Sequence, residues 1–214
     1  MISTSILSIK EDIEENIKKL DDTKTTFMHI DVMDGIFVSN NSISYDVYEN
    51  LLKDVKTPLD VHLMVSDVKK YIDLYKNINP LIITFHYEAV ENHIEIIEYI
   101  KSFNIKAGMA IKPDTKVEEI MDILPYLDLV LVMSVEPGYG HQEFIYDSPV
   151  KINELDKIRK DKNYAYLIEV DGGVNDITAK LCNNADIVVS GSFITDSDSY
   201  DEQIEKIKKM LSII

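Results

Sequence analysis

Short apolar runs rich in β-branched residues recur along the chain, and each is followed by a charged segment with helical spacing. Eight runs are found, at residues 3–7, 27–33, 59–65, 81–86, 105–110, 127–134, 166–172 and 186–191. Strands that alternate with helices predict a parallel sheet whose connections are helical. Eight such units match a TIM (β/α)8 barrel, whereas an open doubly wound sheet more often has about five or six strands. We therefore predict an α/β fold, a single (β/α)8 barrel domain over residues 1–214, with a helix after every strand.

The charge balance limits the partners of this chain. Its 22 Lys and Arg face 38 Asp and Glu, a net charge of −16. Nucleic acids and anionic membranes are bound by basic residues that displace counterions, so we expect neither partner. An anionic small ligand would be repelled by the overall field and would need a local nest of backbone N–H groups.

Compartment signals are few. The single cysteine, Cys182, has no partner for an internal disulfide, which fits a reducing compartment, and we predict a small buried helix residue rather than a reactive thiol. The first residues, MISTSILS, lack the basic and apolar regions of a signal peptide, and no run of about 18 apolar residues occurs. We expect a cytoplasmic protein.

Polar residues interrupt the second predicted strand, FMHIDVM at residues 27–33. Residues two apart on a strand share a face, so His29 and Asp31 lie side by side while Ile30 and Val32 point to the other side. We predict that the apolar pair faces the helices. The polar pair then lies at the barrel mouth, where the carboxyl ends of the strands carry the chemistry of this fold.

Two further strands bring polar residues to the same rim, His62 in LDVHLMV and Asp171 in EVDGG. Together His29, Asp31, His62 and Asp171 offer two nitrogens and two oxygens to one divalent ion, with Zn²⁺, Fe²⁺, Mn²⁺ and Co²⁺ all acceptable. The alternative is a buried network of hydrogen-bonded histidines and aspartates without metal, and spacing alone does not separate the two.

Two neighbouring polar residues carry predictions of their own. His86, at the end of the fourth strand, either lines the site or is a core histidine whose hydrogen bonds are satisfied. Asp34 falls on the opposite alternation beside Gly35, so we predict that it fixes the following turn through backbone hydrogen bonds.

Glycine is concentrated late in the chain. Five of the seven glycines follow the last three strands: Gly138, Gly140, Gly172, Gly173 and Gly191. Glycine lets backbone N–H groups approach an anion, and barrel enzymes commonly bind phosphate after strands seven and eight. We therefore predict a phosphate site, with glycines that merely make turns as the alternative.

Six segments in this order resemble the ribulose-phosphate 3-epimerase family: SILS, HIDVMDGIFVSN, LDVHLMV, VMSVEPGYG, EVDGGVN and SGS. The resemblance spans residue 3 to about 195. It implies a TIM barrel that interconverts ribulose 5-phosphate and xylulose 5-phosphate, in the pentose phosphate pathway, with one divalent metal ion held by His29, Asp31, His62 and Asp171. The substrate contacts that it implies are Ser5, His62, Gly138, Tyr139, Gly140, His141, Gly172, Gly173, Gly191 and Ser192.

The chain departs from the pattern of that family at Thr4, at His141 and in the segment NSISYD after Asn40, which lacks a glycine that is common there. Thr4 stands where a proline is usual, and His141 stands where the phosphate loop usually has another glycine. The imidazole of His141 either crowds the backbone approach to the phosphate or helps to hold it.

The resemblance also implies a mechanism. Inversion at C3 needs one group to remove a proton and another to deliver one to the opposite face, which assigns Asp31 and Asp171 as base and acid, with the roles exchanged in reverse. The metal would stabilise the charge of the enediolate, and no organic cofactor is needed. Alternatives are a 3-epimerase of a ketohexose 6-phosphate such as allulose 6-phosphate, and a catalytically silent barrel that binds sugar phosphates. Association into a homo-oligomer is open.

Overall fold

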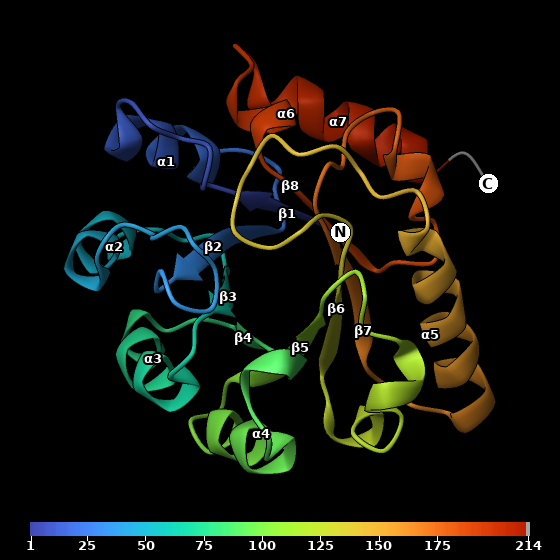
Figure 1. Ribbon diagram of the computed structural model, residues 1–214. Helices are drawn as coiled ribbons and strands as arrows, with labels where there is room; N and C mark the ends of the chain where they lie inside the picture. Colours follow the sequence, from blue (N-terminus) through green and yellow to red (C-terminus); the bar gives the residue numbers. More distant parts are fainter. Residues whose placement is uncertain (213–214) are drawn as a thin grey trace.

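The computed structural model describes residues 1–212, which form a closed barrel of eight parallel strands in the order β1 to β8 (Figure 1). The strands are β1 (Ile2–Ser5), β2 (Phe27–Met33), β3 (Leu59–Met64), β4 (Ile82–His86), β5 (Lys106–Ile111), β6 (Leu129–Met133), β7 (Leu167–Asp171) and β8 (Ile187–Ser190). Each strand pairs with the next, and β8 closes the ring on β1. The predicted single TIM barrel is confirmed.

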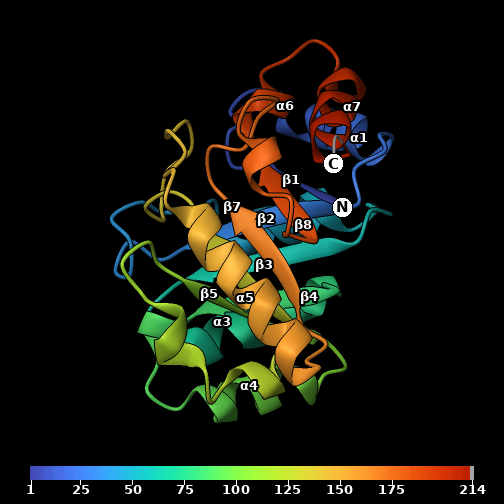
Figure 2. The ribbon, with the colours of Figure 1, turned by 90° about the vertical axis from the view of Figure 1, so that its right-hand side faces the viewer.

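Helices surround this ring of strands (Figure 1). They are α1 (Ile13–Asp21), α2 (Tyr45–Leu52), α3 (Val68–Tyr75), α4 (His93–Lys101), α5 (Ser148–Lys162), α6 (Ser192–Thr195) and α7 (Tyr200–Leu211). The longest, α5, packs along the outside of β6 and β7 (Figure 2). Within residues 1–212, none of the helices has both the length and the apolar character required to cross a bilayer.

After β5 and β7, the expected helices are replaced by short 3₁₀ turns: η3 (Val117–Ile120) and η4 (Leu124–Tyr126) after β5, and η5 (Ala179–Leu181) after β7. Pro125 is the second residue of η4, and a proline in a helix interior removes a backbone donor and clashes with the preceding turn. After β7, the side-chain oxygen of Asn175 accepts the N–H groups of Ile177 and Thr178, which competes with helical hydrogen bonding. A proline after β5 and side-chain hydrogen bonds after β7 therefore account for the absence of the predicted α-helices at these two connections.

The barrel wall separates two apolar regions. Ile30 and Val32 point outward into the main core, which lies between strands and helices, as the alternation predicted. A smaller cluster that includes Leu129 and Leu131 fills the interior. Full burial of one such side chain contributes about 1.5–3 kcal/mol, so the many buried residues of the two clusters hold the strand ends in place.

Cys182 is buried directly after η5, and burial raises the pKa of its thiol to about 12. It is therefore an unreactive packing residue, as predicted, although the turn that it follows is 3₁₀ rather than α-helical.

Candidate active site

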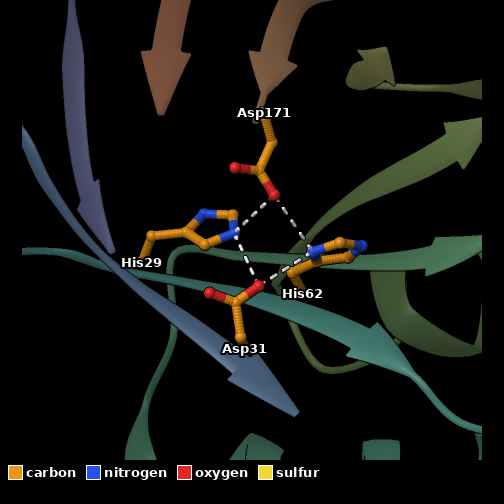
Figure 3. Close-up of side chains that lie close together, drawn as sticks. All are labelled: His29, Asp31, His62 and Asp171. Atoms are coloured by element: carbon orange, nitrogen blue, oxygen red, sulfur yellow. Dashed lines mark hydrogen bonds and ion pairs between the residues drawn. The ribbon is translucent and has the colours of Figure 1, made fainter. Parts of the chain in front are cut away.

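Four side chains converge at the carboxyl end of the barrel, His29 and Asp31 from β2, His62 from β3 and Asp171 from β7 (Figure 3). The register of the sheet pairs Asp31 directly with His62, whereas Asp171 enters from the opposite wall. Nε2 of His29 lies 3.5 Å from Oδ1 of Asp31 and 3.9 Å from Oδ2 of Asp171. Nδ1 of His62 lies 3.2 Å and 3.7 Å from the same two oxygens. The predicted group of four is thus brought together.

This cluster fits a divalent metal ion. Metal bonds of about 2.0–2.2 Å to nitrogen and oxygen place neighbouring ligand atoms roughly 3.0–3.6 Å apart. The four nitrogen-to-oxygen separations, 3.2 to 3.9 Å, lie close to that range. Nε2 of His29 is buried and has no hydrogen-bond partner, a costly state that a bound cation would relieve. These four residues could therefore hold one ion, and their nitrogen and oxygen donors are acceptable ligands for Zn²⁺, Fe²⁺, Mn²⁺ and Co²⁺.

The ring of His29 is oriented from behind by Asp60. Nδ1 of His29 lies 2.7 Å from Oδ2 of Asp60, which also accepts the hydroxyl of Ser3 at 2.9 Å. A proton on Nδ1 accounts for this bond and leaves Nε2 facing the cluster. Burial would lower the pKa of His29, but the carboxylates of Asp60 and Asp31 raise it well above its usual value. Metal binding at His29 therefore competes with protonation of its ring.

Glu169 lies beneath His29, within a second group that also contains Asp60. Burial and the neighbouring Asp60 raise the pKa of Glu169 well above its ordinary value, which favours the protonated, uncharged form of the side chain. Both carboxyl oxygens of Glu169, and Oδ1 of Asp60, are buried and have no hydrogen-bond partner. Sequence reasoning missed Glu169 and Asp60. The signal was available, since each precedes a predicted site residue by two positions and shares its strand face.

The two aspartates of the cluster differ in protonation. Burial would raise the pKa of Asp31, but His29 and His62 lower it below its usual range. Burial and the charge of Asp31 raise the pKa of Asp171 to about 6. Asp31 thus stays ionised while Asp171 takes up a proton as the pH falls through about 6, the arrangement that pairs a base with an acid.

A cavity of about 640 Å³ opens above the cluster. The predicted substrate contacts that line it are Ser5, Gly138, Tyr139, Gly140, His141, Gly172, Gly173, Gly191 and Ser192, together with Asp31 and Asp171. His62, also predicted to contact substrate, is fully buried beneath the cavity and does not line it. The side chain of Asp171 is 16% exposed, which leaves it accessible to a ligand in the cavity.

The glycine-rich end of the cavity approaches the loops after β6, β7 and β8. Gly173 has φ +64°, and a Cβ there would lie 2.6 Å from the backbone nitrogen of Phe144, so glycine is required. His141 has φ +58°, a left-handed conformation that favours glycine, and its Nε2 lies 3.0 Å from Oδ2 of Asp196. No Lys or Arg lines the cavity within residues 1–212, which leaves His141 as its one cationic candidate.

The two polar neighbours, His86 and Asp34, have clear positions. His86 is fully buried and lines no part of the cavity, but its Nε2 lies 2.9 Å from Nε2 of His62. It is therefore a core histidine with satisfied hydrogen bonds that also touches the cluster. Asp34 accepts the N–H groups of Ile36 and Phe37, each at 2.9 Å, which confirms its predicted role in the turn.

Comparison with known proteins gives one consistent result. Residues 1–195 match the model of the ribulose-phosphate 3 epimerase family. A ribulose-phosphate 3-epimerase of Helicobacter pylori strain J99 is 35% identical over 98% of this chain and 95% of its own length. One from Buchnera aphidicola is 39% identical over 92% of this chain and 88% of the relative.

Among solved structures, orotidine 5'-phosphate decarboxylase from Pyrococcus horikoshii superposes with a TM-score of 0.68 over the full length of both chains. At 13% identity, this similarity shows the fold alone. The family match and the curated relatives show more: this chain belongs to the ribulose-phosphate 3 epimerase family.

Proposed function

We propose that this protein is a metal-dependent epimerase that interconverts D-ribulose 5-phosphate and D-xylulose 5-phosphate at C3. The observation that carries the proposal is the pair Asp31 and Asp171, which face each other from opposite walls with opposite tendencies to hold a proton (Figure 3). The names of the relatives support the substrate.

Epimerisation beside a carbonyl removes a proton from one face of the carbon and returns one to the other face. Ionised Asp31 accepts the C3 proton of one epimer, and protonated Asp171 delivers its proton to the opposite face of the enediolate. In the reverse direction the roles exchange. A divalent ion held by His29, Asp31, His62 and Asp171 would supply positive charge beside the substrate oxygens on which negative charge develops.

The rest of the cavity positions the substrate. Ser5 donates to Asp31 and thereby fixes one of its oxygens. At the far end, backbone N–H groups around Gly172, Gly173 and Gly191 suit a phosphate, because glycine permits the close approach that an anion needs. We assign His141 to the same phosphate as a side-chain hydrogen-bond donor. A hydrogen bond from its imidazole would offset the repulsion between the phosphate and the acidic residues around it.

The decisive experiment follows both the product and the proton. Metal-loaded protein is incubated with ribulose 5-phosphate in D₂O, and xylulose 5-phosphate formation and deuterium at C3 are recorded. We expect turnover with deuterium incorporation, and loss of turnover in Asp31→Asn. If neither turnover nor exchange occurs, allulose 6-phosphate is tested next. If that fails while sugar phosphates still bind, the silent binding barrel replaces the epimerase.

A further inference from the structure

His62 is held from behind by two residues that neither line the cavity nor belong to the group of four. We propose that His86 and Glu88, named here the Glu88–His86 pair, are positioning residues that fix the ring orientation and the tautomer of His62 for metal binding. This inference rests on the proposed metal site.

The contacts form one line from the cluster to the end of β4. Nδ1 of His62 faces Asp31 and Asp171, and its Nε2 lies 2.9 Å from Nε2 of His86. On the other side of the second ring, Nδ1 of His86 lies 3.2 Å from Oε2 of Glu88. Both imidazoles are fully buried, so water does not replace the contact between the two rings.

Counting protons along this line gives one consistent arrangement. If Nδ1 of His62 binds a metal ion, the only ring nitrogen left for its proton is Nε2. That N–H can donate to His86 only if Nε2 of His86 carries no proton. The proton of His86 is then on Nδ1, where it donates to the carboxylate of Glu88. Each ring nitrogen therefore has one role, and the carboxylate at the end of the line selects the tautomers of both rings.

Glu88 is itself held firmly. Its Oε1 accepts the backbone N–H of Lys112 at 2.9 Å and the hydroxyl of Thr115. The ring of Phe37 packs against His86, with 4.9 Å between ring centroids. Hydrogen bonds therefore hold Glu88, and an aromatic contact holds His86. The ring of His86 has little freedom to rotate, so its contact with His62 keeps one geometry.

His29 and His62 are consequently oriented by different means. His29 presents Nε2 to the cluster and is backed directly by the carboxylate of Asp60, whereas His62 presents Nδ1 and is backed by the imidazole of His86. If the Glu88–His86 pair has a purely structural role, substitutions in it lower the stability of the fold and leave the affinity for metal unchanged. If the pair positions His62, the same substitutions change the affinity for metal while the fold remains intact.

Substitutions at His86 and Glu88 test this distinction. His86→Leu removes the acceptor for His62, whereas His86→Gln keeps an amide oxygen to accept and an amide N–H to donate. Glu88→Ala and Glu88→Gln form a second such couple. His93→Leu is the matched control, because His93 bonds to the backbone oxygen of Tyr87 and lies outside the cluster. The readouts are the Zn²⁺ affinity by chelator competition, the visible spectrum of the Co²⁺ form, and the thermal midpoint of the metal-free protein.

We expect His86→Leu and Glu88→Ala to weaken Zn²⁺ binding by about 10–100-fold and to alter the Co²⁺ spectrum, while the Gln variants recover most of the affinity. In the Zn²⁺ form, ¹⁵N spectra of the imidazoles should show the proton of His62 on Nε2 and that of His86 on Nδ1. Unchanged affinity and spectrum in His86→Leu and Glu88→Ala, or a proton on Nε2 of His86, would overturn the inference. Failure of the unaltered protein to bind Zn²⁺ or Co²⁺ would instead overturn the proposed metal site.

Discussion

The hydroxyl of Ser5 donates a hydrogen bond of 2.7 Å to Oδ2 of Asp31, so the two oxygens of this buried carboxylate have different surroundings. Oδ1 faces the nitrogens of His29 and His62, while Oδ2 is held by the hydroxyl. The orientation of the proposed base therefore depends on Ser5, the residue in SILS that the resemblance singled out.

Replacement of Ser5 by alanine should lower the rate constant for epimerisation. The change leaves a buried carboxylate oxygen without its donor, at a cost of about 1–3 kcal/mol, and lets the carboxylate rotate. We expect kcat to fall about tenfold, with the thermal midpoint as a parallel readout. Ser102→Ala, at an exposed serine after α4, is the control. A kcat equal to that of the control would show that Asp31 is held without Ser5.

Asp171→Asn should separate proton removal from inversion. Asp31 can still take the C3 proton of one epimer, but no acid delivers a proton to the opposite face. Interconversion should fall by about 10²–10⁴-fold, the usual contribution of a general acid or base. In D₂O, one of the two ketoses should exchange its C3 proton for deuterium faster than it is converted. NMR of the recovered substrate measures this, with metal content checked in parallel, and equal losses of exchange and conversion for both epimers would contradict the assignment.

Two glycines at the cavity should respond oppositely to alanine. At Gly173, φ is +64° and a Cβ would meet the backbone of Phe144 at 2.6 Å, so Gly173→Ala should destabilise the fold by about 1–3 kcal/mol. At Gly191, the nearest atom would be the Cβ of Ser5 at 3.5 Å, so the fold should tolerate the methyl group. Because that methyl group projects toward residues lining the cavity, Gly191→Ala should raise KM instead. Urea unfolding and steady-state kinetics distinguish the two effects, and a stable Gly173→Ala would disprove the first.

His141→Gln should weaken substrate binding while leaving kcat nearly unchanged. Among the described lining residues, His141 is the one side chain able to bring positive charge to a phosphate, and such a charged hydrogen bond is worth about 1.5–3 kcal/mol. We expect KM and the inhibition constant of inorganic phosphate to rise by about tenfold. Asp196→Asn, which removes the carboxylate beside His141, should lower both constants. Unchanged constants in His141→Gln would mean that the imidazole stays with Asp196 when phosphate binds.

Glu88 should make the stability of the metal-free protein depend on pH. Burial would raise the pKa of Glu88, but hydrogen bonds from His86, Thr115 and the backbone of Lys112 lower it to about 2. A lowered folded pKa stabilises the protein above the ordinary value near 4.5, and this contribution is lost as the pH falls toward 2. With its side chain 22% exposed, we expect about 1–2 kcal/mol.

The comparison with Glu88→Gln measures this contribution. Urea unfolding at pH 7 and at pH 3.5 should show a difference between the two proteins that shrinks at the lower pH. A difference that stays constant between these pH values would exclude the carboxylate as its source.

Much of the site follows from local pattern. The alternation in FMHIDVM placed His29 and Asp31 on one face and Ile30 and Val32 on the other, because successive side chains of a strand point to opposite sides. The repetition of strand and helix then determined the barrel, and a barrel places the ends of its strands at one mouth. His62 and Asp171 could therefore be assigned to the same rim although 109 residues separate them.

Only the tertiary structure decided how the imidazole rings are oriented and which groups surround the titratable side chains. The sequence does not tell which nitrogen of each imidazole faces the cluster, because that depends on the groups packed behind each ring, Asp60 for His29 and His86 for His62. Nor does it tell that Asp31 and Asp171 hold protons differently, since their pKa values depend on burial and on charges brought from other strands. Periodicity is a property of neighbours along the chain, whereas protonation and ring orientation are set by contacts across the barrel.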